Sequence, residues 1–442
     1  MQSVLKTISK YKLIKKGEII GVACSGGVDS MSLLHYLNSI KDNFDIEIVA
    51  INVDHSIRDN SEEDTAFVQT YCKENRIRFY KFKIDSNVIA KENKICLEEA
   101  ARIGRYGVFD SLIQKGIVDK IALGHHLQDQ AETILLNIFR GAGLNGAKGM
   151  EYQRGQFIRP MLNTSKLEIL TYAHDNEIPF VEDNSNYDET YSRNYLRHNI
   201  MPKLRMKWSN LDKNIVDFGN ICKEDDAYIK SQMMLDGIIE DKNLVRIPLS
   251  YFIYPQPIVN RMIMNELEYL KASKDIEKKH INIIRDMALE AQNGVKISLP
   301  NALTVHKEYD FIAISVKVAK PKLEPIDFRL GTFKLTNFGN LIVRKTVRFD
   351  VKEDAHLIDA DKLPKGCVIR TRQEGDVFAK FGSGSKKLKD YFIDKKIPQR
   401  LRAEIPLICK DNEVYCVLGY EISDKVKIDE TTKSAYILNY KK

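Results

Sequence analysis

The first 140 residues alternate short apolar runs with amphipathic ones. Runs rich in branched or aromatic residues predict strands, whereas apolar residues that recur every three or four positions predict helices. This alternation is typical of a parallel sheet covered by helices, which binds its ligands at the carboxyl ends of the strands. The expected strands are 19–23, 46–53, 78–84 and 120–123, and the expected helices are 30–39, 62–75, 97–115 and 130–139.

The pattern changes after about residue 210. Apolar residues at helical spacing predict helices at 213–239, 257–272 and 277–291, and strand-like runs follow at 295–299, 303–305 and 311–316. Residues 317–325, with three lysines and two prolines, have the composition of a linker. We therefore expect an α/β catalytic domain at 1–209, a mostly helical middle domain at 210–317 and a small α+β C-terminal domain at 326–442.

A glycine-rich turn joins the first expected strand to the first expected helix. It comprises Ser25, Gly26, Gly27, Val28, Asp29 and Ser30. Glycine lets backbone amides approach a ligand, and the first amides of a helix carry partial positive charge, so the turn suits a phosphate. It lacks the lysine of G-x-x-x-x-G-K-[ST] and the third glycine of a dinucleotide fingerprint. An ordinary glycine turn after a buried strand is the alternative.

This turn resembles the S-G-G-x-D-S loop of the ATP pyrophosphatases, the PP-loop enzymes that split ATP into AMP and pyrophosphate while they adenylate a substrate. The resemblance implies a Rossmann-like parallel sheet of the adenine nucleotide alpha hydrolase type. It also implies that residues 25–30 hold the pyrophosphate part of ATP. Asp29 would then lie close to the phosphates and their Mg²⁺.

Polar residues also follow the second expected strand and lie on the third expected helix. Asp54 and His55 come directly after a buried strand, where they can contact the sugar or phosphates of a nucleotide or simply cap a turn. Arg105 shares a helical face with Glu98 and Arg102. It can therefore form an ion pair within its helix or neutralise phosphate charge as pyrophosphate leaves.

The fourth strand end carries the largest group of chemically active side chains, in G-H-H-L-Q-D-Q-A-E-T at 124–133. Asp129 and Glu132 are spaced i, i+3 and share one face of the first helical turn, where carboxylates can also act as caps. The neighbours His125 and His126 point in different directions, so a two-histidine metal clamp is not expected.

With the glycine turn and V-D-H at 53–55, this stretch resembles the G-H-H-x-D-D-Q-A-E-T pattern of the tRNA(Ile)-lysidine synthetase family. These enzymes use ATP to adenylate the wobble cytidine of the isoleucine tRNA with anticodon CAU. They then replace the activated oxygen with the side-chain amine of free L-lysine. Gln128 stands where the family most often has an aspartate, so no charge-dependent role is assigned to it.

The chemistry of such a reaction suits the residues at this strand end. Free lysine is a cation, and a carboxylate such as Glu132 can bind its ammonium. The attack requires a neutral amine, and therefore a nearby base or a desolvated site that lowers the pKa of the lysine. Asp129 and His125 are both candidates for the base, and the sequence does not choose between them.

Positive charge is concentrated in two stretches. Of a net charge of +7, residues 362–402 contribute 12 Lys and Arg against 4 Asp and Glu, and residues 193–207 hold five Lys and Arg and no acid. Such stretches suit a nucleic acid, with a solvated basic surface as the alternative. Both resemble family motifs, R-N-x-L-R-x-x-I-x-P and K-K-L-K-D-x-F-x-D-x-K-I-P. The resemblance implies that the middle and C-terminal domains contact tRNA and that Arg193, Arg197, Lys386, Lys387 and Lys389 do so.

Composition bears on the location of the protein, on metal sites and on the rival functions. No apolar run is long enough to cross a bilayer, and residues 1–16 lack the apolar core of a signal peptide, so we expect a cytoplasmic protein. The seven cysteines form no C-x-x-C pair, which argues against a zinc or iron-sulfur site. A tRNA thiolase of the same superfamily and a non-catalytic ATP- and RNA-binding protein are the rival interpretations. The family resemblance also leaves room for a homodimer.

Overall fold

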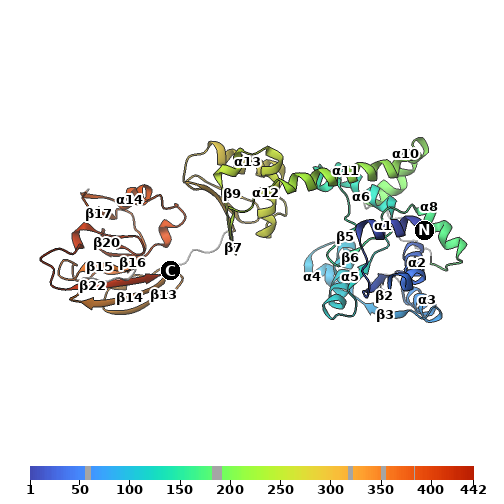
Figure 1. The fold of residues 1–442 in the computed structure, drawn as a ribbon, viewed down its shortest axis with the longest axis horizontal. Helices are drawn as coiled ribbons and strands as arrows, with labels where there is room; N and C mark the ends of the chain where they lie inside the picture. Colours follow the sequence, from blue (N-terminus) through green and yellow to red (C-terminus); the bar gives the residue numbers. More distant parts are fainter. Residues whose placement is uncertain (55–60, 182–191, 317–321, 350–354, 383) are drawn as a thin grey trace. The chain divides into compact units, whose positions relative to one another are not determined.

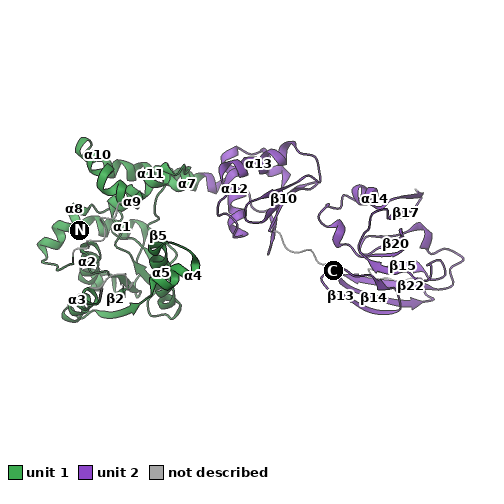
Figure 2. Cartoon of the chain, turned by 180° about the vertical axis from the view of Figure 1, so that it is seen from behind, with its two compact units in different colours: residues 1–228 green, residues 229–442 purple. Residues whose placement is uncertain are grey.

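The computed structural model describes residues 1–54, 61–181, 192–316, 322–349, 355–382 and 384–442. They form two compact units, residues 1–228 and residues 229–442, which are coloured green and purple in Figure 2. No helix in the described ranges has the length and apolar character that a membrane span requires. His55 and residues 182–191 lie outside the described residues.

The first unit is built on a six-stranded sheet in the order β3-β2-β1-β4-β6-β5 (Figure 1). All neighbouring strands run parallel except β5, which pairs antiparallel with β6. The predicted parallel sheet is therefore confirmed, and the carboxyl ends of β1, β2 and β4 share one edge. The strands are β1 (Ile19–Ala23), β2 (Glu47–Asp54), β3 (Arg78–Lys83), β4 (Lys120–Ala122), β5 (Gln153–Arg154) and β6 (Phe157–Ile158).

Helices cover both faces of this sheet because its central strands are apolar on both sides. In β2, Ile48 and Ala50 join one hydrophobic cluster, whereas Val49 and Ile51 join another. The first cluster receives residues from α2, α3 and α8, and the second receives residues from α5. This burial on both faces explains why the strands read as continuous apolar runs. The helices are α2 (Val28–Phe44), α3 (Ser61–Glu74), α5 (Leu97–Gln114) and α8 (Lys166–Asp175).

A second group of helices lies beside the sheet, and its member α6 carries Asp129 and Glu132. Ala131 and Ile134 of α6 pack with Leu196, Met201 and Val216 in one cluster. Through this packing, most of α11 belongs to the first unit. The helix ends at Ser231 rather than at the expected residue 239. The group comprises α6 (Leu127–Phe139), α7 (Leu144–Ala147), α9 (Ser192–Tyr195), the π-helix η2 (Leu196–Ile200), α10 (Met201–Lys207) and α11 (Leu211–Ser231). Of the other helices, α1 (Gln2–Tyr11) packs into the first cluster on the sheet, and α4 (Ser86–Asn93) contacts α5.

The second unit begins with a five-stranded antiparallel sheet that packs against two helices. Its strand order is β7-β8-β11-β10-β9. The hairpin of β7 and β8 was not expected from the sequence, because β7 is three exposed residues long and gives no periodic signal. The elements are β7 (Ile239–Asp241), β8 (Leu244–Pro248), the 3₁₀ helix η3 (Leu249–Ile253), α12 (Gln256–Tyr269), α13 (Lys278–Glu290), β9 (Lys296–Leu299), β10 (Leu303–Lys307) and β11 (Phe311–Val316).

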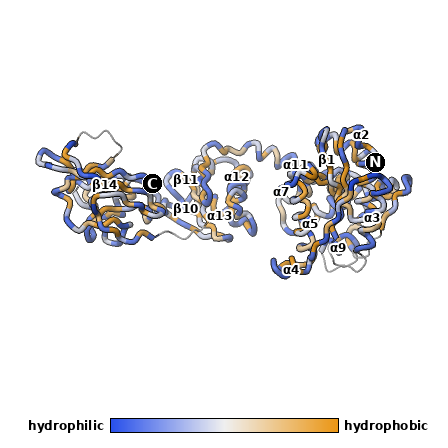
Figure 3. The backbone as a smooth tube through the Cα atoms, turned by 90° about the horizontal axis from the view of Figure 1, so that it is seen from below, coloured by the Kyte–Doolittle hydropathy of each residue, from blue (hydrophilic) through white to orange (hydrophobic). Residues whose placement is uncertain are grey.

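The C-terminal part of this unit contains two further sheets. One has seven strands and the other has four, in the order β13-β14-β22-β15. In Figure 3 hydrophobic and hydrophilic segments alternate along the tube, as expected for strands with one buried face. The elements are β12 (Ile326–Asp327), β13 (Gly331–Leu335), β14 (Gly339–Thr346), β15 (His356–Asp359), β16 (Val368–Arg370), β17 (Val377–Lys380), β18 (Gly384–Lys387), α14 (Leu388–Asp394), η4 (Arg402–Glu404), β19 (Leu407–Lys410), β20 (Glu413–Val417), β21 (Glu421–Ile422), η5 (Asp424–Val426) and β22 (Ala435–Lys441). The three predicted domains stay a prediction, since the structure divides only into the two units.

Two glycines of the first unit, one in the sheet and one on a helix, test how tightly that unit is packed at each position. A Cβ at Gly21 in β1 would lie 2.5 Å from Ile51 Cδ1, whereas a Cβ at Gly107 in α5 would meet no atom within 4 Å. We expect Gly21→Ala to lower the free energy of unfolding by about 1–3 kcal/mol through overpacking. Gly107→Ala should raise it by roughly 0.5–1 kcal/mol, because alanine loses less backbone entropy in a helix. Urea unfolding measures both values, and changes of the same sign would contradict the packing described.

Candidate active site at the strand ends

Hydrogen bonds of Ser30 stabilise the glycine turn between β1 and α2. Ser30 Oγ donates a hydrogen bond to the Gly27 carbonyl at 3.0 Å and accepts one from the Ser25 amide at 3.1 Å. Gly26 has a φ of +92°, which favours glycine, and the first backbone bond of α2 runs from Met31 N to Gly27 O at 3.0 Å. The amides that precede Met31 thus point out of the helix end, as a phosphate site requires.

Asp29 projects from the first turn of α2 and meets a lysine from a distant part of the chain. Its Oδ1 lies 2.6 Å from Lys166 Nζ and 3.9 Å from His126 Nε2. Lys166 is the first residue of α8, and its amide donates to Gln128 Oε1 at 2.9 Å. No sequence motif marks Lys166, because its approach to Asp29 depends on how α8 packs.

Asp129 and Glu132 do lie together on α6, and both are held by arginines. The Arg197 guanidinium donates to Glu132 through Nε at 2.9 Å and Nη2 at 2.7 Å, and to Asp129 Oδ1 through Nη2 at 2.7 Å. Arg193 makes longer contacts of 3.4 Å to both carboxylates. The side chain of Glu132 is only 1% exposed, against 14% for Asp129. The structure therefore joins Glu132, which is predicted to bind lysine, and the candidate base Asp129 with two residues predicted to bind tRNA.

The electrostatics of this cluster follow from burial and from its positive neighbours. Burial alone would raise the pKa of Asp129, but His126, Arg193, His125 and Arg197 outweigh it and lower the pKa to about 2. Burial also lowers the pKa of His125 to about 4, although Asp129 opposes the change. Arg197 is fully charged, because its pairing with Glu132 and Asp129 overcomes burial and raises its pKa. Asp129 is thus a carboxylate and His125 a neutral imidazole near pH 7.

His126 links the glycine turn to the carboxylates of α6. Its Nε2 lies 3.9 Å from Asp29 Oδ1 and 3.6 Å from Asp129 Oδ2, and its backbone amide donates to Asp129 Oδ2 at 3.1 Å. The side-chain Nδ1 atoms of both His125 and His126 are buried without a hydrogen-bond partner among the described residues. Unpaired buried polar atoms of this kind are uncommon and suit contact with a ligand.

The residues predicted at the second strand end and on the third expected helix are less fully assembled into the site. Asp54 ends β2 at the same sheet edge, and the neighbouring Asn52 donates from Nδ2 to the Cys24 carbonyl at 2.9 Å, which ties β2 to the glycine turn. Arg105 lies on α5, where burial lowers its pKa, and Tyr106, Arg102 and Glu98 of its own helix also influence that pKa. Its predicted role toward pyrophosphate stays a prediction.

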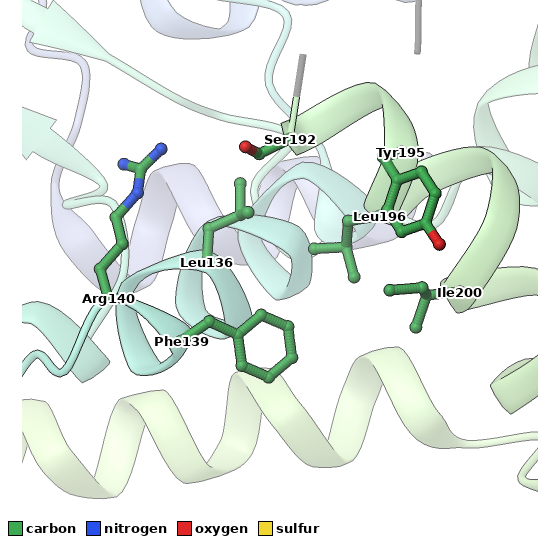
Figure 4. A pocket seen from close by; sticks show the side chains of 7 residues that line it. All are labelled: Leu136, Phe139, Arg140, Ser192, Tyr195, Leu196 and Ile200. Carbon is green, nitrogen blue, oxygen red and sulfur yellow. The ribbon is translucent and has the colours of Figure 1, made fainter. Parts of the chain in front are cut away.

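A groove lies along α6, and Figure 4 shows the side chains that line one part of it. It consists of two hollows of about 390 and 380 Å³ that share Leu136, Arg140 and Ser192. One end includes Arg193 and Thr133, and the Thr133 hydroxyl donates to the Asp129 carbonyl at 2.7 Å. At the other end Phe139 and Tyr195 are 65% and 51% exposed. Half-exposed rings beside an arginine suit a nucleobase and its phosphate.

The remaining predicted tRNA contacts lie in the second unit. Lys386 is in β18, where its ammonium pairs with Asp394, and Lys387 precedes α14 as its N-cap residue. Lys389 is in α14, and it is exposed, as is Lys387. All three lysines belong to one β-strand and helix junction, which fits contact with a phosphate backbone but carries no base-reading geometry.

The carboxylates and cysteines of the chain bear on metal and thiol chemistry. No group of three or more His, Cys, Asp or Glu side chains suitable for a metal occurs within the described ranges. Mg²⁺ needs only one or two carboxylates when phosphates supply the other ligands, and Asp29 beside the outward amides of the glycine turn fits that requirement. Six of the seven cysteines are buried, and burial raises the pKa of Cys24, next to the turn, to about 11. Cys24 is therefore not the low-pKa thiol that sulfur transfer needs.

Comparisons with known proteins agree with this geometry. Residues 1–204 match the family model of the PP-loop domain, and residues 367–438 match that of the TilS substrate C-terminal domain. The chain is 35% identical to a tRNA(Ile)-lysidine synthase of Clostridium acetobutylicum, with 98% of this chain and 97% of that protein covered. It is 33% identical to a tRNA(Ile)-lysidine synthase of Clostridioides difficile, with 99% of each covered.

The burial of His125 predicts a specific pH dependence. Its pKa is about 4 in the folded chain against a usual 6.5, so the unfolded chain binds more protons between these values. The stabilisation by His125 is therefore fully present above pH 6.5 and is lost as the pH falls toward 4. An NMR titration of the imidazole should give a midpoint near 4, and His125→Gln should flatten the pH dependence of unfolding in this range. A midpoint at 6.5 would contradict the burial.

Proposed function

The chain belongs to the tRNA(Ile)-lysidine synthase family, and we propose that it ligates free L-lysine onto C2 of the wobble cytidine of the isoleucine tRNA with anticodon CAU. The ligase uses ATP to adenylate the cytidine, and lysine then displaces AMP. The product, lysidine, changes decoding from AUG to AUA. The observation that supports this most directly is the position of His126, within 4 Å of both Asp29 in the glycine turn and Asp129 on α6.

In the first step the cytidine O2 attacks the α-phosphate of ATP, and pyrophosphate leaves. We propose that the outward amides of the turn from Ser25 to Ser30 hold the phosphates, with Asp54 toward the nucleotide. Asp29 would hold Mg²⁺, whose positive charge would offset the charge on the phosphates. Arg105 is kept as a candidate for neutralising the pyrophosphate as it leaves.

In the second step the ε-amine of lysine attacks C2 of the activated ring, and the C2–O bond to AMP breaks. We propose that Asp129 and Glu132 bind the lysine before it loses its proton. Both Asp129 and His125 remain candidates to receive that proton. A pKa of about 4 makes neutral His125 the stronger base of the two, since that of Asp129 is about 2.

The contacts of Arg193 and Arg197 suggest how RNA enters this site. Both guanidinium groups are about one-third exposed, so phosphate oxygens can reach them while they contact the carboxylates. The groove beside them offers the rings of Phe139 and Tyr195 for stacking. We propose that part of the anticodon loop lies in this groove, while Lys386, Lys387 and Lys389 contact the backbone elsewhere. A cytoplasmic location and a homodimer remain predictions.

Two rival interpretations have different consequences. A thiolase that uses protein thiols loses activity when all seven cysteines are replaced by serine, whereas a lysidine synthase retains it. A non-catalytic binding protein binds ATP and RNA without releasing pyrophosphate. The buried cysteines and the paired carboxylates favour the synthase.

An activity assay of the full chain tests the proposal. With ATP, Mg²⁺, lysine and isoleucine tRNA we expect tRNA-dependent pyrophosphate release and incorporation of lysine into the tRNA. Asp29→Ala should reduce pyrophosphate release about 10²- to 10³-fold, as loss of one transition-state contact does elsewhere. Asp42→Ala, at an exposed position later in α2, is the matched control and should keep full activity. Full activity of Asp29→Ala would remove the phosphate site from the turn.

A further inference from the structure

We propose that Lys166 supplies the phosphate-binding cation that the glycine turn lacks, and that Gln128 positions it. This inference rests on the proposed use of ATP. The turn at residues 25–30 contains no lysine or arginine, unlike the common nucleotide loop, in which a lysine reaches the terminal phosphates. Lys166 brings an ammonium to the same place from a position 137 residues away from Asp29.

The ion pair of Lys166 with Asp29 can exchange partners. The two side chains are 35% and 31% exposed, so a ligand at the turn can reach both. Pairs exposed to this degree contribute little net stability. When the phosphates and Mg²⁺ occupy the turn, Asp29 gains a stronger cation, and the Lys166 ammonium becomes free to bind a phosphate oxygen. Lysine suits this exchange because its charge sits at the end of a flexible stem.

The start of α8 is fixed against the start of α6, which limits where the ammonium can go. Leu127 N donates to the Thr164 carbonyl at 3.0 Å, and Lys166 N donates to Gln128 Oε1 at 2.9 Å. Ser165 caps α8 by accepting a hydrogen bond from Glu168 N at 3.1 Å. The backbone of Lys166 is thus held by the helix that carries Asp129 and Glu132.

The contacts of Gln128 explain why a glutamine suits this position, where the family most often has an aspartate. Its amide oxygen accepts the Lys166 N–H, and its Nε2 lies 3.5 Å from Asp212 Oδ2. An aspartate at 128 would bring a second negative charge toward Asp212, which already pairs with Arg205 at 2.8 Å, and would add a carboxylate beside the start of α8. The neutral glutamine keeps the backbone contact and leaves the ammonium directed to Asp29.

Ligands that differ in their phosphates test the role of Lys166. Equilibrium dialysis of the full chain should show that Lys166→Met weakens binding of ATP and of inorganic pyrophosphate about ten- to a hundredfold, the usual worth of a charge-assisted hydrogen bond. Binding of AMP should stay within about twofold, since AMP lacks the β- and γ-phosphates, and Lys166→Arg should restore most of the ATP affinity. Lys41→Met, at the far end of α2, is the control and should match the wild type.

The outcomes separate this inference from the proposed function. A wild-type chain that binds no ATP and releases no pyrophosphate refutes the function. A wild-type chain that does both while Lys166→Met binds ATP and pyrophosphate normally refutes the inference alone. Equal weakening of AMP and pyrophosphate, or no recovery with Lys166→Arg, also refutes it, because a structural pair would behave in that way. Urea midpoints of the variants establish that each one is folded.

The positioning role of Gln128 is tested by a double-mutant cycle. Gln128→Ala removes the acceptor of the Lys166 amide and should weaken pyrophosphate binding about two- to fivefold, as loss of a neutral hydrogen bond does. In the Lys166→Met background the same change should have no further effect, because the group that it positions is absent. An equal loss in both backgrounds would show that Gln128 acts independently of Lys166.

Discussion

The burial of Glu132 constrains the whole region around α6. A carboxylate that is 1% exposed is strongly unfavourable unless a cation and hydrogen bonds compensate it, and Arg197 supplies both. Arg197 lies in η2, so the segment from α9 to α10 is tied to the helix that begins at the sheet edge. Because Asp129 shares the same guanidinium, the two carboxylates and the basic segment form one electrostatic unit.

Under the proposed function, this unit would connect the two substrates that meet at the site. RNA phosphates would be alternative partners for Arg193 and Arg197, and the lysine ammonium would be an alternative partner for Asp129 and Glu132. If RNA alone drew Arg197 away, Glu132 would be left buried and unpaired, which is costly. In the proposed reaction, arrival of lysine would compensate that cost, so the binding of either substrate would favour the other. The pair of Lys166 and Asp29 would play the corresponding part on the proposed ATP side, where both side chains are more exposed than Glu132.

Local signals predicted the fold around the site well. The expected strand at 19–23 coincides with β1, and the glycine turn lies between β1 and α2 as expected, because both follow from residues adjacent in sequence. The contacts of Arg197 and Lys166 were not predictable, since each depends on the packing of helices more than 60 residues apart in sequence. β7 was missed for a different reason, because a short exposed edge strand has no periodic pattern to detect.

The most direct test of this account separates adenylation from lysine transfer in one variant. Glu132→Gln keeps the shape of the side chain but removes the charge that is proposed to bind the ammonium. We predict that tRNA-dependent pyrophosphate release stays within about threefold of the wild type, while the KM for lysine rises about tenfold or more, as expected for the loss of a charged hydrogen bond. An unchanged KM for lysine, or an equal loss of both partial reactions, would contradict the account.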